Sequence, residues 1–310
     1  MRMKETRKEQ MKIVRTPAEV RGILSGIRRA GKRIGLVPTM GALHEGHVSL
    51  VRLARERTGC VVTSIFVNPK QFGPKEDFRS YPRSEVRDTE ILESLGCDVV
   101  FAPSDRDFYS SADQTRITVQ ELSDVLCGAS RPDHFQGVVL VVAKLFNIVQ
   151  PDEAYFGQKD AQQAVIIQRM TADLDFPIRI VIGPTIREPD GLALSSRNDY
   201  LTPQERKRAP ALYRSLEMAR RRIERGERDV NALTAIIRGE VEGEGIDLDY
   251  AEIVDGATLE TLTRVEGTVL LAVAGRIGSA RLIDNIALTV SGDEVKEVVL
   301  EFPEWSRYGW

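Results

Sequence analysis

The sequence has few of the residues that mark whole classes of proteins. Among its 310 residues are only three cysteines and three histidines. The cysteines, Cys60, Cys97 and Cys127, lie far apart, without the even pairing of a secreted disulfide framework or the CxxC spacing of a zinc site. A reactive thiol is one alternative for each, but we predict reduced, mostly buried cysteines that serve as small core residues.

Neither sign of charge dominates, and long apolar runs are missing. The chain has 43 basic and 46 acidic side chains, a balance that points neither to nucleic acid nor to a membrane surface. No apolar run approaches the ~18 residues that span a bilayer, and the first residues, MRMKETRKEQMKIV, lack the apolar region of a signal peptide. We expect a cytoplasmic protein whose partners are small molecules.

Short β-branched runs alternate with helical patterns through residue 185. The strand-like runs are RIGLVPT, CVVTSIFV, DVVFAP, EAYFG and IRIVIG, and helices are expected over residues 44–57, 85–95, 137–149 and 160–173. This alternation predicts parallel βαβ units and hence a doubly wound, Rossmann-like α/β domain over residues 11–185. Ligands of such sheets bind at the carboxyl ends of the strands, so the residues that follow each strand matter most.

The pattern changes near residue 186. Thr202, Pro203 and Glu205 form a capping box with proline at the first helical position, which predicts a helix that runs to about residue 226. A second helix near residue 230 and the strand-like runs IDLDYAEIV, TVLLAVAGRI and ARLIDNIAL follow. We predict a smaller α+β domain over residues 186–290, with terminal extensions at 1–10 and 291–310.

Two histidines stand three residues apart in PTMGALHEGH, directly after the first predicted strand. His44 and His47 would share one face of the first turn of the next helix. A helix amino terminus offers free N–H groups and the positive end of a dipole, so this placement favours a phosphate site. Surface or capping histidines and a zinc site are the alternatives. Zincins need an HExxH spacing and a third ligand, whereas the remaining histidine is His134 in RPDHF.

Other polar segments follow the remaining strands. NPKQFG follows CVVTSIFV, GQKD follows EAYF, and GPTIR follows IRIVI. Lys159 of GQKD could bind phosphate as a point charge, and LSSRN at residues 194–198 adds two hydroxyls and a guanidinium. Taken singly, each is also typical of an ordinary surface turn. Their combination is what indicates a shared site.

Five segments together resemble one family. VPTMGALHEGH, SIFVNPKQFGPKEDFRSYPR, RPDHFQGV, YFGQKDAQQ and REPDGLALSSRN are similar, in order and spacing, to the pantothenate synthetases, the AMP-forming pantoate–β-alanine ligases. The resemblance runs from about residue 11 to 288, and the HxGH element alone also marks the wider nucleotidyltransferase superfamily. It implies ATP-dependent condensation of D-pantoate with β-alanine through a pantoyl adenylate, which gives pantothenate, AMP and pyrophosphate.

The resemblance also implies roles for individual residues. The catalytic set would be His44, His47, Lys159 and Arg197, with His47 as proton donor. ATP would be bound by Met40, Gly41, Ala42, Leu43, His44, Glu45, Gly46, His47, Gly157, Gln158, Lys159, Asp160, Ile186, Leu194, Ser195, Ser196 and Arg197. Gln71 and Gln163 would bind pantoate, and Gln71 would also meet β-alanine. Mg²⁺ is expected on the triphosphate, with Asp88 as the family position nearest to it.

The resemblance further implies a homodimer and a second domain that closes over the nucleotide. Residues 71–83 have the composition of a mobile lid, although a rigid loop is equally consistent with them. Leu194 replaces the family's usual methionine, a volume-conserving change. The tail carries Trp305 and Trp310, which suggest packing against another part of the structure.

Two other functions compete with the ligase. Another HxGH adenylyltransferase would take a phosphorylated substrate, for which arginine or lysine would be expected in place of Gln71 and Gln163. A nucleotide-binding regulatory protein without catalysis would not need the intact set of His44, His47, Lys159 and Arg197.

Overall fold

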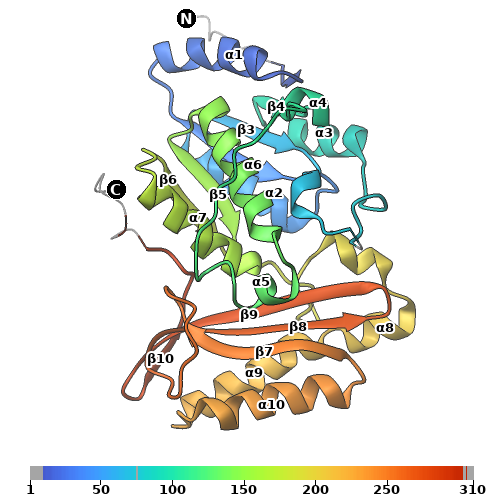
Figure 1. The fold of residues 1–310 in the computed structure, drawn as a ribbon, viewed down its shortest axis with the longest axis vertical. Coiled ribbons are helices and arrows are strands. Elements are labelled where there is room, and N and C mark those ends of the chain that lie inside the picture. The colour runs from blue at the N-terminus through green and yellow to red at the C-terminus, as the bar shows by residue number, and fades with distance from the viewer. Residues whose placement is uncertain (1–9, 75, 303–304, 306–310) are drawn as a thin grey trace, which may run out of the picture.

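A six-stranded parallel sheet forms the centre of the larger unit (Figure 1). The computed structural model describes residues 10–74, 76–302 and 305; most of the predicted amino-terminal extension lies outside the described residues. The strand order is β1-β4-β3-β2-β5-β6. The strands are β1 (Lys12–Val14), β2 (Ile34–Thr39), β3 (Cys60–Ile65), β4 (Val99–Phe101), β5 (Glu153–Gly157) and β6 (Arg179–Gly183).

This strand order reverses between β2 and β5. From β2 the chain proceeds outward through β3 and β4, whereas β5 and β6 lie on the other side of β2. Ligands of doubly wound sheets bind where the order reverses, outside the carboxyl ends of the strands. The segments that follow Thr39 and Gly157 therefore border the expected binding crevice.

Helices connect these strands and cover the sheet (Figure 1). They are α1 (Pro17–Arg29), α2 (Glu45–Arg57), α3 (Glu85–Ser94), α4 (Asp105–Phe108), α5 (Cys127–Ser130), α6 (His134–Val149) and α7 (Ala161–Asp173). The predicted Rossmann-like sheet is confirmed. The predictions omitted β1 and α1, although α1 begins with a capping box between Thr16 and Glu19. Cys60, Cys97 and Cys127 are free and buried, as predicted.

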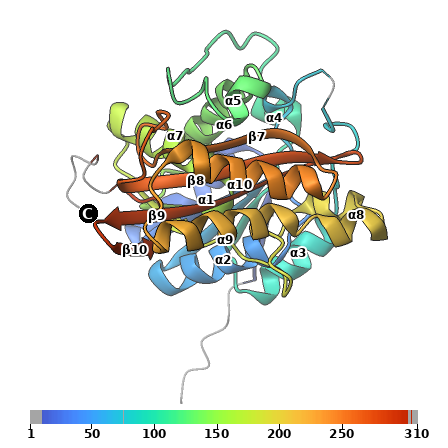
Figure 2. The same cartoon turned by 90° about the horizontal axis from the view of Figure 1, so that it is seen from below.

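The smaller unit is an antiparallel sheet with helices on one face. Its strands, in the order β10-β9-β8-β7, are β7 (Asp247–Asp255), β8 (Gly267–Ile277), β9 (Ala280–Ser291) and β10 (Glu294–Glu297). The helices of this unit are α8 (Pro203–Arg208), α9 (Ala211–Glu224) and α10 (Val230–Gly243). Figure 2 shows α9 and α10 lying across one face of the sheet. In Figure 1 the opposite face lies toward the larger unit.

The helix predicted from residue 202 to about 226 is two helices. Its capping box is present: Thr202 Oγ1 accepts from the Glu205 N–H at 3.3 Å, and Glu205 Oε2 accepts from the Thr202 N–H at 2.8 Å. However, α8 ends at Arg208 and α9 begins at Ala211. Pro210 lies between them, and proline cannot donate the backbone hydrogen bond that a continuous helix needs.

The carboxyl-terminal tail packs back onto the larger unit. The Leu300 N–H donates to Gln158 Oε1 at 3.0 Å, and Gln168 Nε2 donates to the Leu300 carbonyl at 2.9 Å. Glu301 Oε1 accepts from the N–H of Ile182, on the edge strand β6. Trp305 stacks on Phe302 with ring centroids 4.4 Å apart, and the Arg169 guanidinium of α7 lies 5.6 Å from the centroid of the Trp305 ring. The predicted packing is confirmed for Trp305, whereas Trp310 lies outside the described residues.

Leu300 anchors this tail, and its replacement should destabilise the protein. Its side chain is only 1 % exposed, so Leu300→Ala is expected to lower the free energy of unfolding by about 2–4 kcal/mol through lost burial and a residual cavity. The neighbouring Val299 is 38 % exposed, so Val299→Ala is the matched control with little expected change. Chemical denaturation measures both; equal effects of the two changes would contradict the anchoring role.

Candidate active site

Two adjoining cavities lie at the carboxyl ends of the sheet strands. The smaller, of about 220 Å³, borders the ends of β2, β3 and β5, and the larger, of about 1090 Å³, extends between the two units. Both are lined by Arg131, His134, Lys159, Asp160, Gln163, Ser195 and Arg197. Residues from well-separated segments of the chain thus meet in one space, the position expected for a ligand of this sheet.

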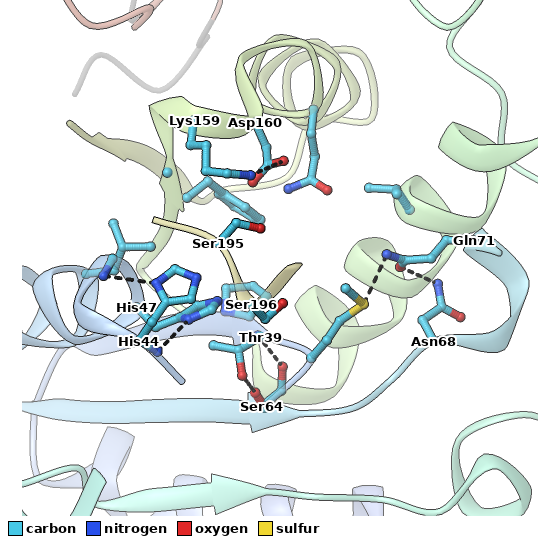
Figure 3. A pocket seen from close by; sticks show the side chains of 18 of the residues that line it. Thr39, His44, His47, Ser64, Asn68, Gln71, Lys159, Asp160, Ser195 and Ser196 are labelled. Atoms are coloured by element: carbon cyan, nitrogen blue, oxygen red, sulfur yellow. Dashed lines mark hydrogen bonds and ion pairs between the residues drawn. The ribbon is translucent and has the colours of Figure 1, made fainter. Parts of the chain in front are cut away.

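The two histidines of PTMGALHEGH cap α2. His44 is the N-cap residue, and its Nδ1 accepts from the Gly46 N–H at 3.1 Å. His47 Nδ1 accepts from the His44 N–H at 3.3 Å, and the ring centroids lie 4.1 Å apart (Figure 3). A Cβ on Gly46 would lie 2.9 Å from the His44 ring, so glycine here allows the ring to reach its capping position.

These hydrogen bonds set the proton positions on both rings. Because each Nδ1 accepts from a backbone N–H, the neutral ring must carry its proton on Nε2. Burial lowers the pKa of His44 to about 4, and the positive charge of Lys159 acts in the same direction. Burial likewise lowers the pKa of His47 to about 3, with His44 adding to the effect. At neutral pH the pair therefore offers N–H donors rather than two positive charges.

The low pKa values of the histidines predict a pH-dependent stability. Burial also lowers the pKa of His134 to about 4, whereas histidine in an unfolded chain titrates near ~6.5. Between these values the unfolded chain binds more protons, so the free energy of unfolding should fall as the pH is lowered from about 6.5 toward 4. Calorimetry at pH 7, 6 and 5 should show a decreasing melting temperature, with a shallower decrease in His134→Asn. A melting temperature that stays constant over this range would contradict the prediction.

The turn that precedes His44 is held by Asp88. Gly41 and Ala42 have positive φ angles of 83° and 50°. Asp88 Oδ2 accepts from the Ala42 N–H and Oδ1 from the Leu43 N–H, both at 2.8 Å. Asp88 is 1 % exposed and lines neither cavity. Its carboxylate therefore organises the turn from the side away from the cavity, which is not the position expected of a ligand for a metal on the triphosphate.

Lys159 and Arg197 bring positive charge to the cavities. Lys159 lies in the short 3-10 helix Gln158–Asp160 between β5 and α7, with Nζ 3.6 Å from Asp160 Oδ1 (Figure 3). Arg197 donates two hydrogen bonds of 3.0 Å to the carboxylate of Asp77. The Tyr81 and Ser196 hydroxyls lie 3.2 Å apart. Residues 71–83, the expected lid, thus contact the LSSRN segment directly.

Gln71 is oriented by a residue that the sequence predictions missed. Asn68, three residues beyond the end of β3, donates from Nδ2 to Gln71 Oε1 at 2.9 Å and accepts the Tyr109 hydroxyl on Oδ1 at 2.8 Å. Gln71 Nε2 donates toward Met40 Sδ at 3.2 Å (Figure 3). Asn68 fixes which end of the Gln71 amide carries the donors. Its place directly after a predicted strand was the available signal.

His134 also has a structural role that its motif did not reveal. Glu76 forms two hydrogen bonds with Arg131, at 2.6 and 2.8 Å, and Arg131 Nη1 lies 3.0 Å from His134 Nε2. Since a guanidinium only donates, His134 Nε2 accepts, and its Nδ1–H donates to the Gln71 carbonyl at 2.8 Å. This chain of contacts joins residues 71–83 to the start of α6 and fixes the backbone at Gln71.

Most of the predicted site residues meet in the smaller cavity. Its lining includes Met40, His44, Gly46, His47, Gln71, Gly157, Lys159, Asp160, Gln163, Ile186, Leu194, Ser195, Ser196 and Arg197. Gly41, Ala42, Leu43, Glu45 and Gln158 do not line it. Leu43 is buried in the core, Glu45 pairs with Arg52, and Gln158 contacts Asn285 on β9.

Within the described part of the chain, no group of three or more histidine, cysteine, aspartate or glutamate side chains is arranged to hold a metal ion. The same residues contain no helix that is long and apolar enough to cross a membrane.

The sequence profile of the family described as pantoate-beta-alanine ligase matches residues 12–287. The chain belongs to this family. Among relatives of this ligase is the pantothenate synthetase of Moorella thermoacetica, 52 % identical over 286 residues that cover 91 % of this chain and all of the relative. The chain is accordingly a ligase that forms pantothenate, as the sequence motifs predicted.

Solved structures support the same assignment for the ligase. The pantothenate synthetase from Thermus thermophilus aligns with a TM-score of 0.85 and 45 % identity, covering 89 % of this chain and 98 % of that one. The pantoate-beta-alanine ligase from Francisella tularensis, crystallised with beta-gamma ATP and beta-alanine, aligns with a TM-score of 0.73 and 36 % identity, covering 89 % and 97 %. Both the parallel sheet and the small antiparallel unit therefore belong to the family fold.

Proposed function

We propose that the ligase activates pantoate as an adenylate in the smaller cavity. In the first step a pantoate carboxylate oxygen attacks the α-phosphorus of ATP, and the bond to pyrophosphate breaks. In the second, the amine of β-alanine attacks the acyl carbon, AMP leaves and the amine loses a proton. The observation that carries the proposal is the convergence of His44, His47, Lys159 and Gln71 on one cavity.

Phosphate binding and charge stabilisation are assigned to four side chains. His44 and His47 supply Nε2–H donors, Lys159 supplies a point charge, and Arg197 supplies a planar guanidinium. Displacement at phosphorus needs positioned reactants and neutralised charge more than a protein nucleophile. In this arrangement His47 acts as a neutral hydrogen-bond donor, which differs from the proton-donor role that the resemblance implied.

The remaining cavity residues are assigned to the nucleoside and to the organic substrates. Gly157, Asp160 and Ile186 would border the ribose and the base, with residues 194–197 over the triphosphate. Gln71 and Gln163 would bind pantoate, because an amide can donate to the carboxylate and accept from the hydroxyls. Gln71 would also meet β-alanine. The complex of the Francisella tularensis ligase with beta-gamma ATP and beta-alanine supports the assignments of ATP and β-alanine.

Magnesium is proposed to enter with ATP rather than to reside in the protein. This hard cation keeps several waters and binds phosphate oxygens, where it would neutralise charge. Asp88 is not assigned to it, because both carboxylate oxygens already accept backbone N–H groups. A homodimer stays a prediction of the family resemblance, and a cytoplasmic location stays a prediction of the composition and the polar amino terminus.

Product analysis with all four components tests the proposal. AMP should appear when ATP, magnesium, D-pantoate and β-alanine are present, and omission of pantoate should abolish it. Pantoate alone should support exchange of labelled pyrophosphate into ATP, because the adenylate forms before β-alanine reacts. If AMP forms equally well without pantoate, or if exchange requires β-alanine, the adenylate route is wrong.

A further inference from the structure

Asn285 links the small unit to the turn that carries Lys159. It lies on β9, is 5 % exposed, and donates from Nδ2 to the carbonyls of Gln158 at 3.0 Å and Lys159 at 2.8 Å. Its Oδ1 accepts from Gln158 Nε2 at 3.3 Å. The two consecutive carbonyls of the 3-10 turn are thus both held by one amide from the other unit.

Only one orientation of this amide is chemically consistent. With the Asn285 oxygen and nitrogen exchanged, an acceptor would face two carbonyl oxygens, and a donor would face the Gln158 amide nitrogen. Aspartate at this position would place a negative oxygen against the same two carbonyls. The contact therefore depends on an amide and not merely on a polar side chain of this size.

Asn285 and its neighbour on β9, Asp284, also hold the segment after β6. Asp284, 1 % exposed on its side chain, forms hydrogen bonds of 2.6 and 2.9 Å with Arg187, which follows Ile186. Arg187 donates in addition to the Asn285 carbonyl at 3.2 Å. Residues 284–285 thus fix two edges of the cavity relative to each other, the turn at Lys159 and the segment at Ile186.

Gln158 extends this support to the tail. Its Oε1 accepts from the Leu300 N–H at 3.0 Å while its Nε2 donates to Asn285. The Gln158 side chain therefore points away from the smaller cavity, and the residue after it, Lys159, lines that cavity. Asn285 thus holds the backbone on one side of the turn, and the Lys159 side chain extends into the cavity on the other. In this arrangement the backbone contacts can determine where the Lys159 ammonium group lies.

We propose that Asn285 is a positioning residue for Lys159. By holding the carbonyls of residues 158 and 159, it sets where the ammonium group stands relative to the triphosphate. Asn285 does not line the smaller cavity, and the proposal rests on the phosphate role assigned to Lys159. A displacement of about 1 Å at a reacting centre can lower a rate by about 100-fold, so the expected effect is on turnover.

A double-mutant cycle tests this coupling. Asn285→Ala and Asn285→Asp are each made in two backgrounds, the native chain and the Lys159→Ala variant. For every variant, pantoate-dependent ATP–pyrophosphate exchange is measured, together with the KM values for ATP and for pantoate. In the native background we expect kcat to fall about 10- to 100-fold, with the KM for pantoate unchanged. In the Lys159→Ala background the same substitutions should lower kcat less than about 3-fold, because the group that Asn285 positions is already gone.

Ser130→Ala is the matched control. Ser130 Oγ donates to Asp249 at 3.1 Å and so also joins the two units, but it does not contact the turn at Lys159. Its loss should leave exchange near the native rate. Melting temperatures are recorded for every variant, and Asn285→Ser, which keeps one hydroxyl donor, replaces any variant that fails to fold.

The possible outcomes distinguish failure of the positioning role of Asn285 from failure of the phosphate role of Lys159. Equal losses from Asn285→Ala in both backgrounds would overturn the positioning role, because the effect would then not pass through Lys159. Native exchange in Asn285→Asp would overturn it as well. Near-native exchange in Lys159→Ala alone would instead overturn the phosphate role assigned to that lysine.

Discussion

Replacing His47 by alanine is expected to lower the rate of adenylate formation by about 100-fold or more, the loss typical of removing one preorganised donor to a developing charge. The side chain stands at the start of α2, and its contact with the His44 N–H sets its proton on Nε2. Pantoate-dependent exchange of pyrophosphate into ATP measures this step without the second reaction. Near-native exchange would show that His47 does not act on the phosphates.

His47→Gln distinguishes the two chemical roles of this residue. Glutamine retains a neutral N–H donor near the Nε2 position but cannot act as an imidazolium acid. Because the low pKa of His47 keeps the ring neutral, His47→Gln should keep at least about 10-fold more activity than His47→Ala. Equal losses in the two variants would favour a proton-donating imidazolium.

Asp88→Ala is the second substitution with a large expected effect. It would leave the N–H groups of Ala42 and Leu43 without their buried acceptor, and the positive φ angles of the turn would lose their main restraint. A shifted turn displaces His44, so kcat for adenylate formation should fall by about 100-fold. The melting temperature should fall as well, because unsatisfied buried donors are costly.

Magnesium titration of the Asp88 variants separates the turn from a metal role. Asp88→Asn keeps one oxygen acceptor but turns an amide N–H toward the other backbone donor, so it should be nearly as impaired as Asp88→Ala. Raising the magnesium concentration should rescue neither variant. Full rescue by magnesium would instead return Asp88 to the metal role that the family resemblance suggested.

The sequence predicted the order of strands and helices where local signals were strong. β-branched runs bounded by glycine and proline mark β2, β3, β4 and β6, because such strands are buried on both faces and tolerate few polar residues. The continuous helix expected from residue 202 was wrong at Pro210, although proline's missing N–H is a local property. A helix boundary set by a single residue is easily overlooked where a long amphipathic pattern predicts one continuous helix.

The candidate site was predictable where its residues follow strands, and much less so where distant contacts matter. His44, Gln71 and Lys159 each come soon after a strand, so the topology brings them together. Asp88 lies 45 residues from Leu43, and Asn285 lies 126 residues from Lys159. Which backbone groups those side chains would hold depends on how the units pack, and no local pattern encodes that.

The contact between Asp77 and Arg197 turns anion binding at this guanidinium into an exchange. Asp77, 120 residues away in the sequence, already accepts from Nε and Nη2 of Arg197. A phosphate must displace Asp77 to bind that edge of the guanidinium, and otherwise binds the remaining N–H donors. The net binding free energy of the phosphate at this edge is then the difference between its interaction with Arg197 and the Arg197–Asp77 interaction that it replaces. Both are charge-assisted hydrogen-bonded pairs. The displaced Asp77 loses one tether to the LSSRN segment, whereas the Tyr81–Ser196 contact and the Glu76–Arg131 pair still hold residues 71–83.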